Sequence, residues 1–441
     1  MKTSISSLPA ALQTLFFERA PQLAKEEHLV KRKRCFDASS LLITLVLGWL
    51  THPLAGPSQL ARFAHTLGVK ISKQALDQRL TQPTARWLLR VLQEAVGLMI
   101  FPPVLSKGLL ARFPAVILED ASTIELPALL APLWKGCGGN GSSSSLKLGV
   151  RYDLRSGQLF GPILQDGKRH ETTNGVHALP LASKALWIAD AGYYAITFLR
   201  SLHAQGSFFL MRPCGNLVVS TPLGERLDLA AVLSASPQKV VDLCVRLGSV
   251  PRLWLAARLI ALPVDPLTAA KRREHIMERA RQRGHAPSAV TLALAGWNLL
   301  VTNVAPSMLT AEEALVLYRS RWQIELLFKV WKSHGHIDEW KSKNADHILC
   351  EVYAKLLAML VEHWMLVTMC FDDPHRSWQL CAGLLRDHVS LLRDGLLGRL
   401  PLKRVCSLLH RILADSASIP ARANRPNTSR QLLDGKYWGL T

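Results

Sequence analysis

Apolar residues recur at three- and four-residue spacing through the first 110 residues of the chain. This spacing places apolar side chains on one face of a helix, so we expect a helical region over 1–110. From Arg112 onward the pattern changes to short runs of β-branched and aromatic residues separated by glycine, asparagine and serine. Such runs predict strands, and they mark the start of a second segment.

The second segment mixes strands and helices. We expect strands at 115–118, 146–154, 158–164, 185–189 and 207–211, with a helix at 195–204 before the last of them. Strands in a meander followed by alternating helix and strand predict a mixed α/β fold. The stretch 136–145 is rich in glycine and serine, so we expect it to form a mobile surface loop.

The remaining sequence predicts more strands and then helices. Strands are expected at 217–220, 240–247, 252–262 and 292–304, with a basic helix at 271–283 between the last two. After Pro306 the pattern predicts one long helix that Thr310 opens, and 342–441 has a helical pattern. The chain therefore divides into segments 1–110, 111–212, 213–293, 294–341 and 342–441.

Two stretches of the first segment are candidates for contact with an anionic partner. Residues 59–67 and 73–80, joined through Gly68-Val69 with Ser72 as N-cap, are similar to a helix-turn-helix. An ordinary antiparallel helix pair explains this pattern equally well. Lys31 to Arg34 form a compact basic run, which either binds phosphate or is simply solvated.

The composition adds a constraint on the partner. The 441 residues are 49% hydrophobic and 20% charged, which is typical of a globular protein. A net charge of +20 indicates a polyanionic partner, either nucleic acid or an anionic membrane surface. No uninterrupted apolar run reaches the roughly 20 residues that cross a membrane, and no signal peptide is recognisable, so we expect a cytoplasmic protein. The eight cysteines form no C-x-x-C pair, so neither a zinc module nor a disulfide framework is expected.

The segment from Tyr318 to Lys332 carries the strongest local signal. At about 100° per residue, one stripe of this helix collects a phenol, a carboxylate and three cations: Tyr318, Arg321, Glu325, Lys329 and Lys332. Three cations overcompensate one carboxylate unless another anion, such as a phosphate, binds beside them. A solvated helix with Glu325 and Lys329 as an i,i+4 pair is the alternative.

A carboxylate among phosphate-binding cations indicates metal-assisted phosphoryl transfer, which needs further carboxylates to hold Mg²⁺ ions. Asp120 ends the expected strand AVILED, and Asp190 ends the expected strand ALWIAD. Glu119 competes with Asp120, because neighbouring strand residues face opposite ways. Asp153 is a weaker competitor.

These residues resemble a known family. The spacing Tyr318-x2-Arg321-x3-Glu325-x6-Lys332 resembles the Y-R-E-K signature of bacterial insertion-sequence transposases of the DDE type, in the fourth insertion-sequence family. Residues 118–123 and 189–193 resemble its first and second acidic motifs. Ala121 stands where relatives often have Ser or Thr, which puts a hydroxyl contact at that position in doubt.

The resemblance implies an RNase H-like catalytic core in 111–212 and 294–341, interrupted by a β-rich insertion. Asp120, Asp190 and Glu325 would be catalytic and bind two Mg²⁺ ions, for which Mn²⁺ can substitute. The implied DNA contacts are Tyr318, Arg321, Lys329, Lys332, Trp297 and Arg212. Trp297 matches an aromatic residue near a flipped base, although burial within its strand is an equal explanation.

The function that follows is cut-and-paste transposition of an insertion sequence, with end cleavage, a hairpin intermediate and strand transfer. The partners would be double-stranded DNA, as terminal inverted repeats and target, and a second copy of the chain in a synaptic homodimer. Residues 1–110 would bind the repeats, and 342–441 would support dimerisation. The protein would work in the bacterial cytoplasm, at the nucleoid. The alternatives are an RNase H-like nuclease or resolvase without strand transfer, and an inactive transposase-derived DNA-binding regulator.

Overall fold

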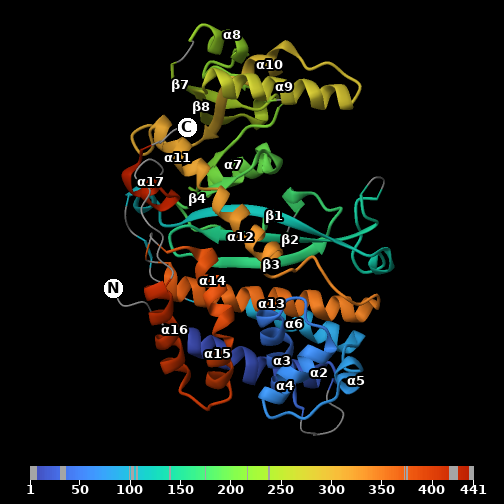
Figure 1. The fold of residues 1–441 in the computed structure, drawn as a ribbon. Helices are drawn as coiled ribbons and strands as arrows, with labels where there is room; N and C mark the ends of the chain where they lie inside the picture. Colours follow the sequence, from blue (N-terminus) through green and yellow to red (C-terminus); the bar gives the residue numbers. More distant parts are fainter. Residues whose placement is uncertain are drawn as a thin grey trace.

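A single β-sheet contains strands from the middle of the chain and from the segment that follows it (Figure 1). The computed structural model describes residues 7–29, 36–98, 100, 104–105, 108–138, 141–173, 175–215, 217–236, 239–371, 373, 376–416 and 426–436. The basic run 31–34 lies outside these residues. Within the described chain the sheet has nine strands in the order β3-β2-β1-β4-β5-β9-β8-β7-β6.

The strands are β1 (Val116–Leu126), β2 (Ser144–Asp153), β3 (Leu159–Asp166), β4 (Leu186–Ala189), β5 (Phe208–Met211), β6 (Val219–Ser220), β7 (Val241–Leu247), β8 (Leu255–Pro263) and β9 (Trp297–Thr302). The helices of eight or more residues are α3 (Ala38–Thr51), α4 (Pro57–Thr66), α6 (Gln82–Gly97), α7 (Ile196–Ala204), α9 (Pro266–Gln282), α11 (Ala311–Arg319), α12 (Trp322–Ser333), α13 (Ala345–Cys370), α14 (Trp378–Asp387), α15 (Val389–Leu396) and α16 (Leu402–Ser416). The shorter helices and turns are α1 (Ser7–Gln13), η1 (Thr14–Arg19), α2 (Ala20–Glu26), α5 (Lys73–Asp77), η2 (Gly108–Arg112), η3 (Ala128–Leu130), η4 (Glu171–Thr173), η5 (Ala191–Tyr193), α8 (Leu229–Ser234), η6 (Pro251–Leu253), α10 (Ala289–Leu294) and α17 (Thr428–Asp434).

The strand directions confirm the mixed α/β fold, an RNase H-like core with a β-rich insertion and flanking helices. β1 pairs antiparallel with β2 and parallel with β4, and β4 pairs parallel with β5. β9 returns antiparallel to β5. The insertion strands β8, β7 and β6 then continue the sheet beyond β9 in antiparallel order. The insertion is therefore an extension of the core sheet rather than a separate sheet.

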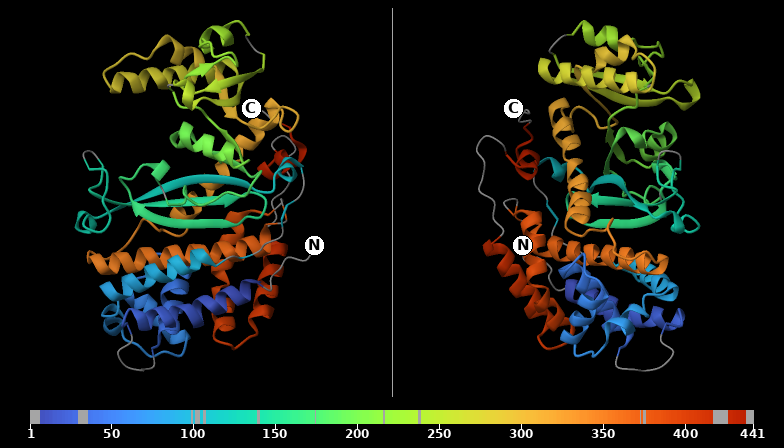
Figure 2. Two further views of the ribbon diagram at one scale, coloured as in Figure 1. Left: turned by 180° about the vertical axis from the view of Figure 1, so that it is seen from behind. Right: turned by 45° about the vertical axis from the view of Figure 1, so that its right-hand side comes forward.

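Helices from both ends of the chain form one layer, on the side of the sheet away from the insertion (Figure 2), whereas α17 packs against η2 and α11. α13 is its central helix, and α3, α6 and α16 pack around it. α13 has the length and hydropathy of a membrane-spanning helix, but its apolar stretch is entirely buried inside the protein. Its buried charges are paired: Lys355 with Glu351 at 2.8 Å and Glu362 with Arg386 at 2.8 Å. α13 is thus the core helix of this layer.

Three expectations about local structure need correction. Ser144 and Ser145 do not belong to a mobile loop: they begin β2 and are buried, and the Ser144 hydroxyl donates to the Trp134 carbonyl at 2.8 Å. The expected strand 292–304 begins only at Trp297, because Ser288 caps a helix, α10, just before it. The expected long helix after Pro306 is two helices, α11 and α12.

The helix pair that resembles a helix-turn-helix consists of α4 and the five-residue α5. The Ser72 hydroxyl accepts a hydrogen bond from the Ala75 amide at 3.1 Å, which confirms Ser72 as the N-cap. The second helix ends at Asp77 and is therefore shorter than the expected 73–80.

Candidate active site

Asp120 lies in β1, and Asp190 directly follows β4, the parallel neighbour of β1. In the register of β1 and β4, Glu119 is opposite Ala189, and each aspartate is the next residue of its chain. Asp190 follows the end of β4, as expected, but Asp120 does not end a strand, because β1 runs on to Leu126. β2 is the only described strand that pairs with the second half of β1, so Asp120 lies directly beyond the last residue of β1 that pairs with β4.

The competing acids have structural partners. Glu119 is fully buried and accepts hydrogen bonds from Arg151 Nε at 2.6 Å, His177 Nδ1 at 2.7 Å and Trp187 Nε1 at 2.8 Å. Burial opposes ionisation of Glu119, but the His177 hydrogen bond and the Arg151 charge outweigh it and lower the pKa of the carboxyl group. Asp153 accepts from the Val116 amide and the Ser156 hydroxyl. Neither carboxylate faces the site of Asp120.

The segment that carries Tyr318, Arg321 and Glu325 bends slightly between α11 and α12. The Arg321 amide bonds to the Tyr318 carbonyl at 3.1 Å and the Ile324 amide to the Arg321 carbonyl at 3.1 Å, three residues apart in each case. Such bonds tighten the turn without reversing the chain. The polar stripe therefore continues across the junction, while Ile324, Phe328 and Trp331 are buried on the opposite face, as expected.

Side chains from four elements meet at this junction. Arg321 Nη2 lies 2.5 Å from Glu325 Oε1, and Arg321 Nη1 lies 3.7 Å from Asp120 Oδ2. The Tyr318 hydroxyl donates to Asp190 Oδ1 at 3.3 Å. The structure thus brings together all three acids, with Arg321 between two of them and Tyr318 on the third.

The two lysines of the stripe lie farther along α12. Lys332 Nζ donates to the Thr123 carbonyl at 2.9 Å, which ties the end of α12 to the second half of β1. Lys329 is exposed. α12 is therefore attached to the strand of Asp120 at two points, through Arg321 and through Lys332.

The charges around Asp120 change its ionisation. Burial raises the pKa of Asp120 to about 6, and the negative charges of Glu171 and Glu325 add to this effect against the Ala121 amide and the Arg321 cation. Burial also raises the pKa of Tyr318 to about 12, so its phenol keeps its proton. Glu171 was not expected from the sequence, since it lies in a polar loop between β3 and β4 with no motif around it.

The donor set suits a hard divalent cation. Asp120, Asp190 and Glu325 offer carboxylate oxygens, the ligands that Mg²⁺ prefers, and burial, which raises the pKa of Asp120, makes its negative charge unfavourable without a cation beside it. In the described part of the chain no three His, Cys, Asp or Glu side chains converge closely enough to hold an ion as they stand. The guanidinium of Arg321 supplies the positive charge between Asp120 and Glu325 instead.

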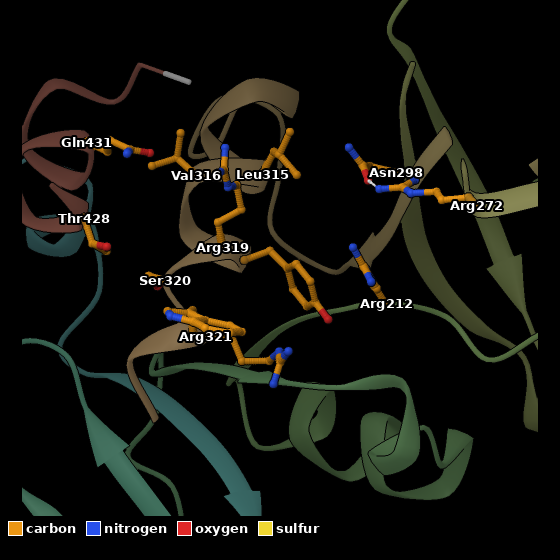
Figure 3. A pocket seen from close by; sticks show the side chains of 12 residues that line it. Arg212, Arg272, Asn298, Leu315, Val316, Arg319, Ser320, Arg321, Thr428 and Gln431 are labelled. Atoms are coloured by element: carbon orange, nitrogen blue, oxygen red, sulfur yellow. Dashed lines mark hydrogen bonds between the residues drawn. The ribbon is translucent and has the colours of Figure 1, made fainter. Parts of the chain in front are cut away.

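A basic pocket of about 330 Å³ opens beside these acids. Four arginines line it: Arg212, Arg272, Arg319 and Arg321. Figure 3 shows Arg212 and Arg272 on one side of the α11 turn, and Thr428 and Gln431 of α17 on the other. The Arg212 guanidinium lies over the Tyr318 ring, 5.5 Å from its centroid.

Two pocket residues come from the insertion and its junction. Arg272 of α9 donates to the Trp297 carbonyl at 3.2 Å and to Asn298 Oδ1 at 2.9 Å. Asn298 lines the pocket, whereas the Trp297 side chain is half-buried against Leu233, Val241 and Ala261 of the insertion. The structure brings Arg212 to Tyr318 but leaves the Trp297 indole outside the pocket. Arg319 was not expected, because no spacing distinguishes it from other helix-end arginines.

Comparisons with known proteins agree with this geometry. Residues 111–361 match the family model described as "Transposase DDE domain". The chain is 25% identical over 429 residues to the transposase for insertion sequence element IS231F of Bacillus thuringiensis subsp. israelensis, covering 89% of this chain and 87% of that protein. It is 25% identical over 372 residues, 79% of this chain and 77% of the relative, to the transposase for insertion sequence element IS1151 of Clostridium perfringens. A 122-residue stretch, 27% of this chain and 32% of the relative, is 35% identical to the putative transposase InsL for insertion sequence element IS186A of Escherichia coli (strain K12).

Proposed function

The chain belongs to the transposase DDE domain family, and we propose that this transposase excises and inserts an insertion sequence by metal-dependent cut-and-paste chemistry. One observation carries the proposal: Tyr318 contacts Asp190 while Arg321 contacts both Asp120 and Glu325. Acids from three separate elements, 205 positions apart in sequence from first to last, meet around phosphate-binding side chains. Such a meeting is what phosphoryl transfer on DNA requires.

In this proposal Asp120, Asp190 and Glu325 hold two Mg²⁺ ions, which Mn²⁺ can replace. When bound, the ions would activate the attacking water or 3′-hydroxyl and neutralise the leaving oxygen. The protein's own contribution is to fix the carboxylates: Asp120 and Asp190 through the register of β1 and β4, and Glu325 through α12. Arg321 balances the carboxylate charge before cations and DNA enter.

The phosphate contacts of the proposal lie in the basic pocket. Arginine binds phosphate oxygens in a bidentate manner, and Arg212 and Arg321 both lie over the ring of Tyr318, whose hydroxyl points to Asp190. Lys329 and Lys332 extend the positive stripe along α12. Trp297 keeps part of its indole accessible at the edge of the insertion, and we assign it to contact with a flipped base of the transposon end.

The segments divide the work. We assign repeat binding to 1–110, catalysis to 111–212 and 294–341, support of the bound DNA to the insertion 213–293, and dimerisation in the synaptic complex to 342–441. Because α3 and α6 of 1–110 pack on α13, which belongs to 342–441, repeat binding and dimerisation would be mechanically linked. DNA as the partner agrees with the net charge of +20. The site of action would be the cytoplasm, at the nucleoid.

The experiment that tests the proposal incubates the full chain with Mg²⁺ and DNA that bears the element's inverted repeats. Hairpin ends and strand-transfer products support cut-and-paste transposition. Nicking alone indicates a nuclease or resolvase, and binding without cleavage indicates a regulator. Glu325→Gln should abolish all products, whereas Glu312→Gln, an exposed acid of α11, should not. If Glu325→Gln cleaves like the unmodified chain, the catalytic assignment is wrong.

A further inference from the structure

The helix α17, close to the C-terminal end of the chain, forms one wall of the basic pocket. It contributes Thr428 and Gln431 to the lining, and these side chains lie across the α11 turn from Arg212 and Arg272 (Figure 3). The arginines supply the charge of the pocket, whereas the α17 wall is neutral. The pocket therefore has one side that suits phosphate and one side that suits a neutral polar group.

α17 is held in place by contacts outside the pocket. Leu432 is 6% exposed and belongs to the main hydrophobic core. Gly108 of η2 meets the α17 backbone directly, because a Cβ atom at Gly108 would lie 2.3 Å from the Leu432 carbonyl oxygen and 2.6 Å from Leu433 Cα. Only glycine allows so close an approach. The side chains of Thr428 and Gln431 are therefore not what docks the helix.

The Thr428 hydroxyl is available as a donor. It accepts a hydrogen bond from Gln323 Nε2 at 3.0 Å, which joins α17 to the helix of Glu325. A hydroxyl that accepts still has one proton to donate, and no described residue accepts it. The Thr428 side chain is only half-buried, so a ligand in the pocket can accept this proton.

The Gln431 side chain offers an acceptor beside that donor. Its Nε2 donates to the Pro426 carbonyl at 2.8 Å. Because the two polar atoms of an amide point apart, Oε1 faces away from Pro426, and none of the described residues donates to it. Thr428 and Gln431 are three positions apart on one helix, so the donor and the acceptor share one face.

A donor beside an acceptor is complementary to one kind of base edge. In the major groove adenine presents the N7 acceptor beside the N6 amino donor, whereas guanine presents two acceptors, cytosine a donor and thymine an acceptor beside its methyl group. A phosphate presents acceptors only, and the carbonyl oxygen of Gln431 would repel them. The neutral wall is therefore suited to adenine rather than to the DNA backbone.

We propose that Thr428 and Gln431 determine sequence specificity at the transposon end, where Thr428 donates to N7 and Gln431 accepts from N6 of one adenine close to the cleaved bond. The inference rests on the proposed function, because it takes DNA as the ligand of the pocket from there. The arginines hold the phosphates and so position the DNA, and α17 reads the base.

The first test uses the full chain and repeat DNA in which each adenine near the cleaved end is replaced in turn by 7-deazaadenine, which lacks the N7 acceptor. Fluorescence anisotropy should show one position at which this replacement weakens binding about tenfold, near the lower end of what a good pair of base contacts provides. Thr428→Val should bind both DNAs equally at that position, because the two changes remove one contact. Thr428→Ser keeps the hydroxyl and should keep the tenfold difference.

The second test addresses the acceptor. Gln431→Leu should lose most of the preference for adenine over guanine at the same position but keep the sensitivity to 7-deazaadenine. Gln205→Leu removes an exposed glutamine outside the residues that line the pocket and should change neither property. If no position responds to 7-deazaadenine, or if Thr428→Val responds like the unmodified chain, the base contact is wrong. An equal loss of affinity for every sequence in both α17 variants also overturns it, because that result indicates a backbone contact.

Cleavage of the same DNA separates this inference from the proposed function. If the unmodified chain forms hairpin and strand-transfer products while its α17 variants retain full base discrimination, the role of α17 alone is wrong. If base discrimination depends on Thr428 and Gln431 but the unmodified chain forms no product with Mg²⁺, α17 reads DNA and the proposed catalytic function is wrong.

Discussion

The hydroxyl of Tyr318 donates a hydrogen bond to Asp190 Oδ1 over 3.3 Å and so joins the end of α11 to the end of β4. The same ring lies beneath two guanidinium groups, those of Arg212 and Arg321. Tyr318 is therefore the residue through which the second aspartate, the basic pocket and the junction of α11 with α12 are connected.

Tyr318→Phe removes the hydroxyl and keeps the aromatic ring, so it tests the role of the hydroxyl alone. The ring still supports both arginines, so the free energy of unfolding should fall by no more than about 1 kcal/mol. DNA cleavage should slow about tenfold, because Asp190 loses its orienting donor and the phosphate loses a contact. Single-turnover cleavage of labelled repeat DNA measures this rate.

Tyr353→Phe is the matched control for Tyr318→Phe. It removes a hydroxyl that accepts from Trp134 Nε1 at 2.9 Å in the helical layer, away from the acids. Its effect on stability should be similar, with cleavage unchanged. Equal cleavage rates in Tyr318→Phe and the unmodified chain would show that the hydroxyl has no role in catalysis.

Glu119→Gln should destabilise the fold strongly. The substitution leaves the guanidinium of Arg151 buried without its charge partner, a change that costs about 3–5 kcal/mol. Glu125→Gln, on the exposed side of the same strand, should stay within about 0.5 kcal/mol of the unmodified chain. Urea unfolding followed by circular dichroism compares the two, and a loss below 1 kcal/mol in Glu119→Gln would contradict the buried pair.

The positions of Asp120 and Asp190 at buried strands were predictable from sequence, because a run of apolar residues, which is a local signal, precedes each of them. The full length of β1 was not. Its second half alternates exposed and buried positions and owes its strand conformation to pairing with β2. That pairing joins residues 18 to 28 positions apart, beyond the reach of local pattern.

Other features depended on tertiary structure in the same way. The break at Ser320 keeps the helical period of the side chains, so periodicity could not reveal it. The charge of Glu171 acts on the pKa of Asp120 because η4 packs against η5, the turn that follows Asp190. The composition of 136–145 predicts a loop, but it does not show which groups the serine hydroxyls bond to. In the folded chain the buried serines at the start of β2 have partners such as the Trp134 carbonyl.

His363 should make stability fall as the solution becomes acidic. Burial lowers the pKa of His363 from 6.5 to about 4, while the Gly157 carbonyl accepts from its Nε2 at 2.9 Å. Between these two pH values the unfolded chain binds a proton on this imidazole that the folded chain does not. Stability from this group is therefore complete above pH 6.5 and declines by up to about 3 kcal/mol as pH falls to 4.

His363→Gln isolates this contribution. The amide can still donate to the Gly157 carbonyl but has no proton to gain, so the variant should lose less stability than the unmodified chain between pH 6.5 and 4. The neighbouring Glu362, whose pKa is raised by burial, acts in the opposite direction and is present in both proteins. Urea unfolding at four pH values gives the comparison, and parallel curves would refute the assignment to His363.

Arg272→Ala should weaken DNA binding and reduce its dependence on salt. Arg272 lines the basic pocket from α9, so its loss removes one phosphate contact, and the slope of log affinity against log salt should fall by about 1. Arg252→Ala removes an exposed cation in η6, outside the residues that line the pocket, and should leave the slope unchanged. Fluorescence anisotropy with repeat DNA at several salt concentrations measures both.

Arg272 also donates a hydrogen bond to Asn298 at 2.9 Å, so Asn298→Ala separates the phosphate contact of Arg272 from its role in holding the pocket wall. A normal slope in Asn298→Ala assigns the loss in Arg272→Ala to the phosphate contact. An equal fall in both variants assigns the loss to distortion of the pocket wall.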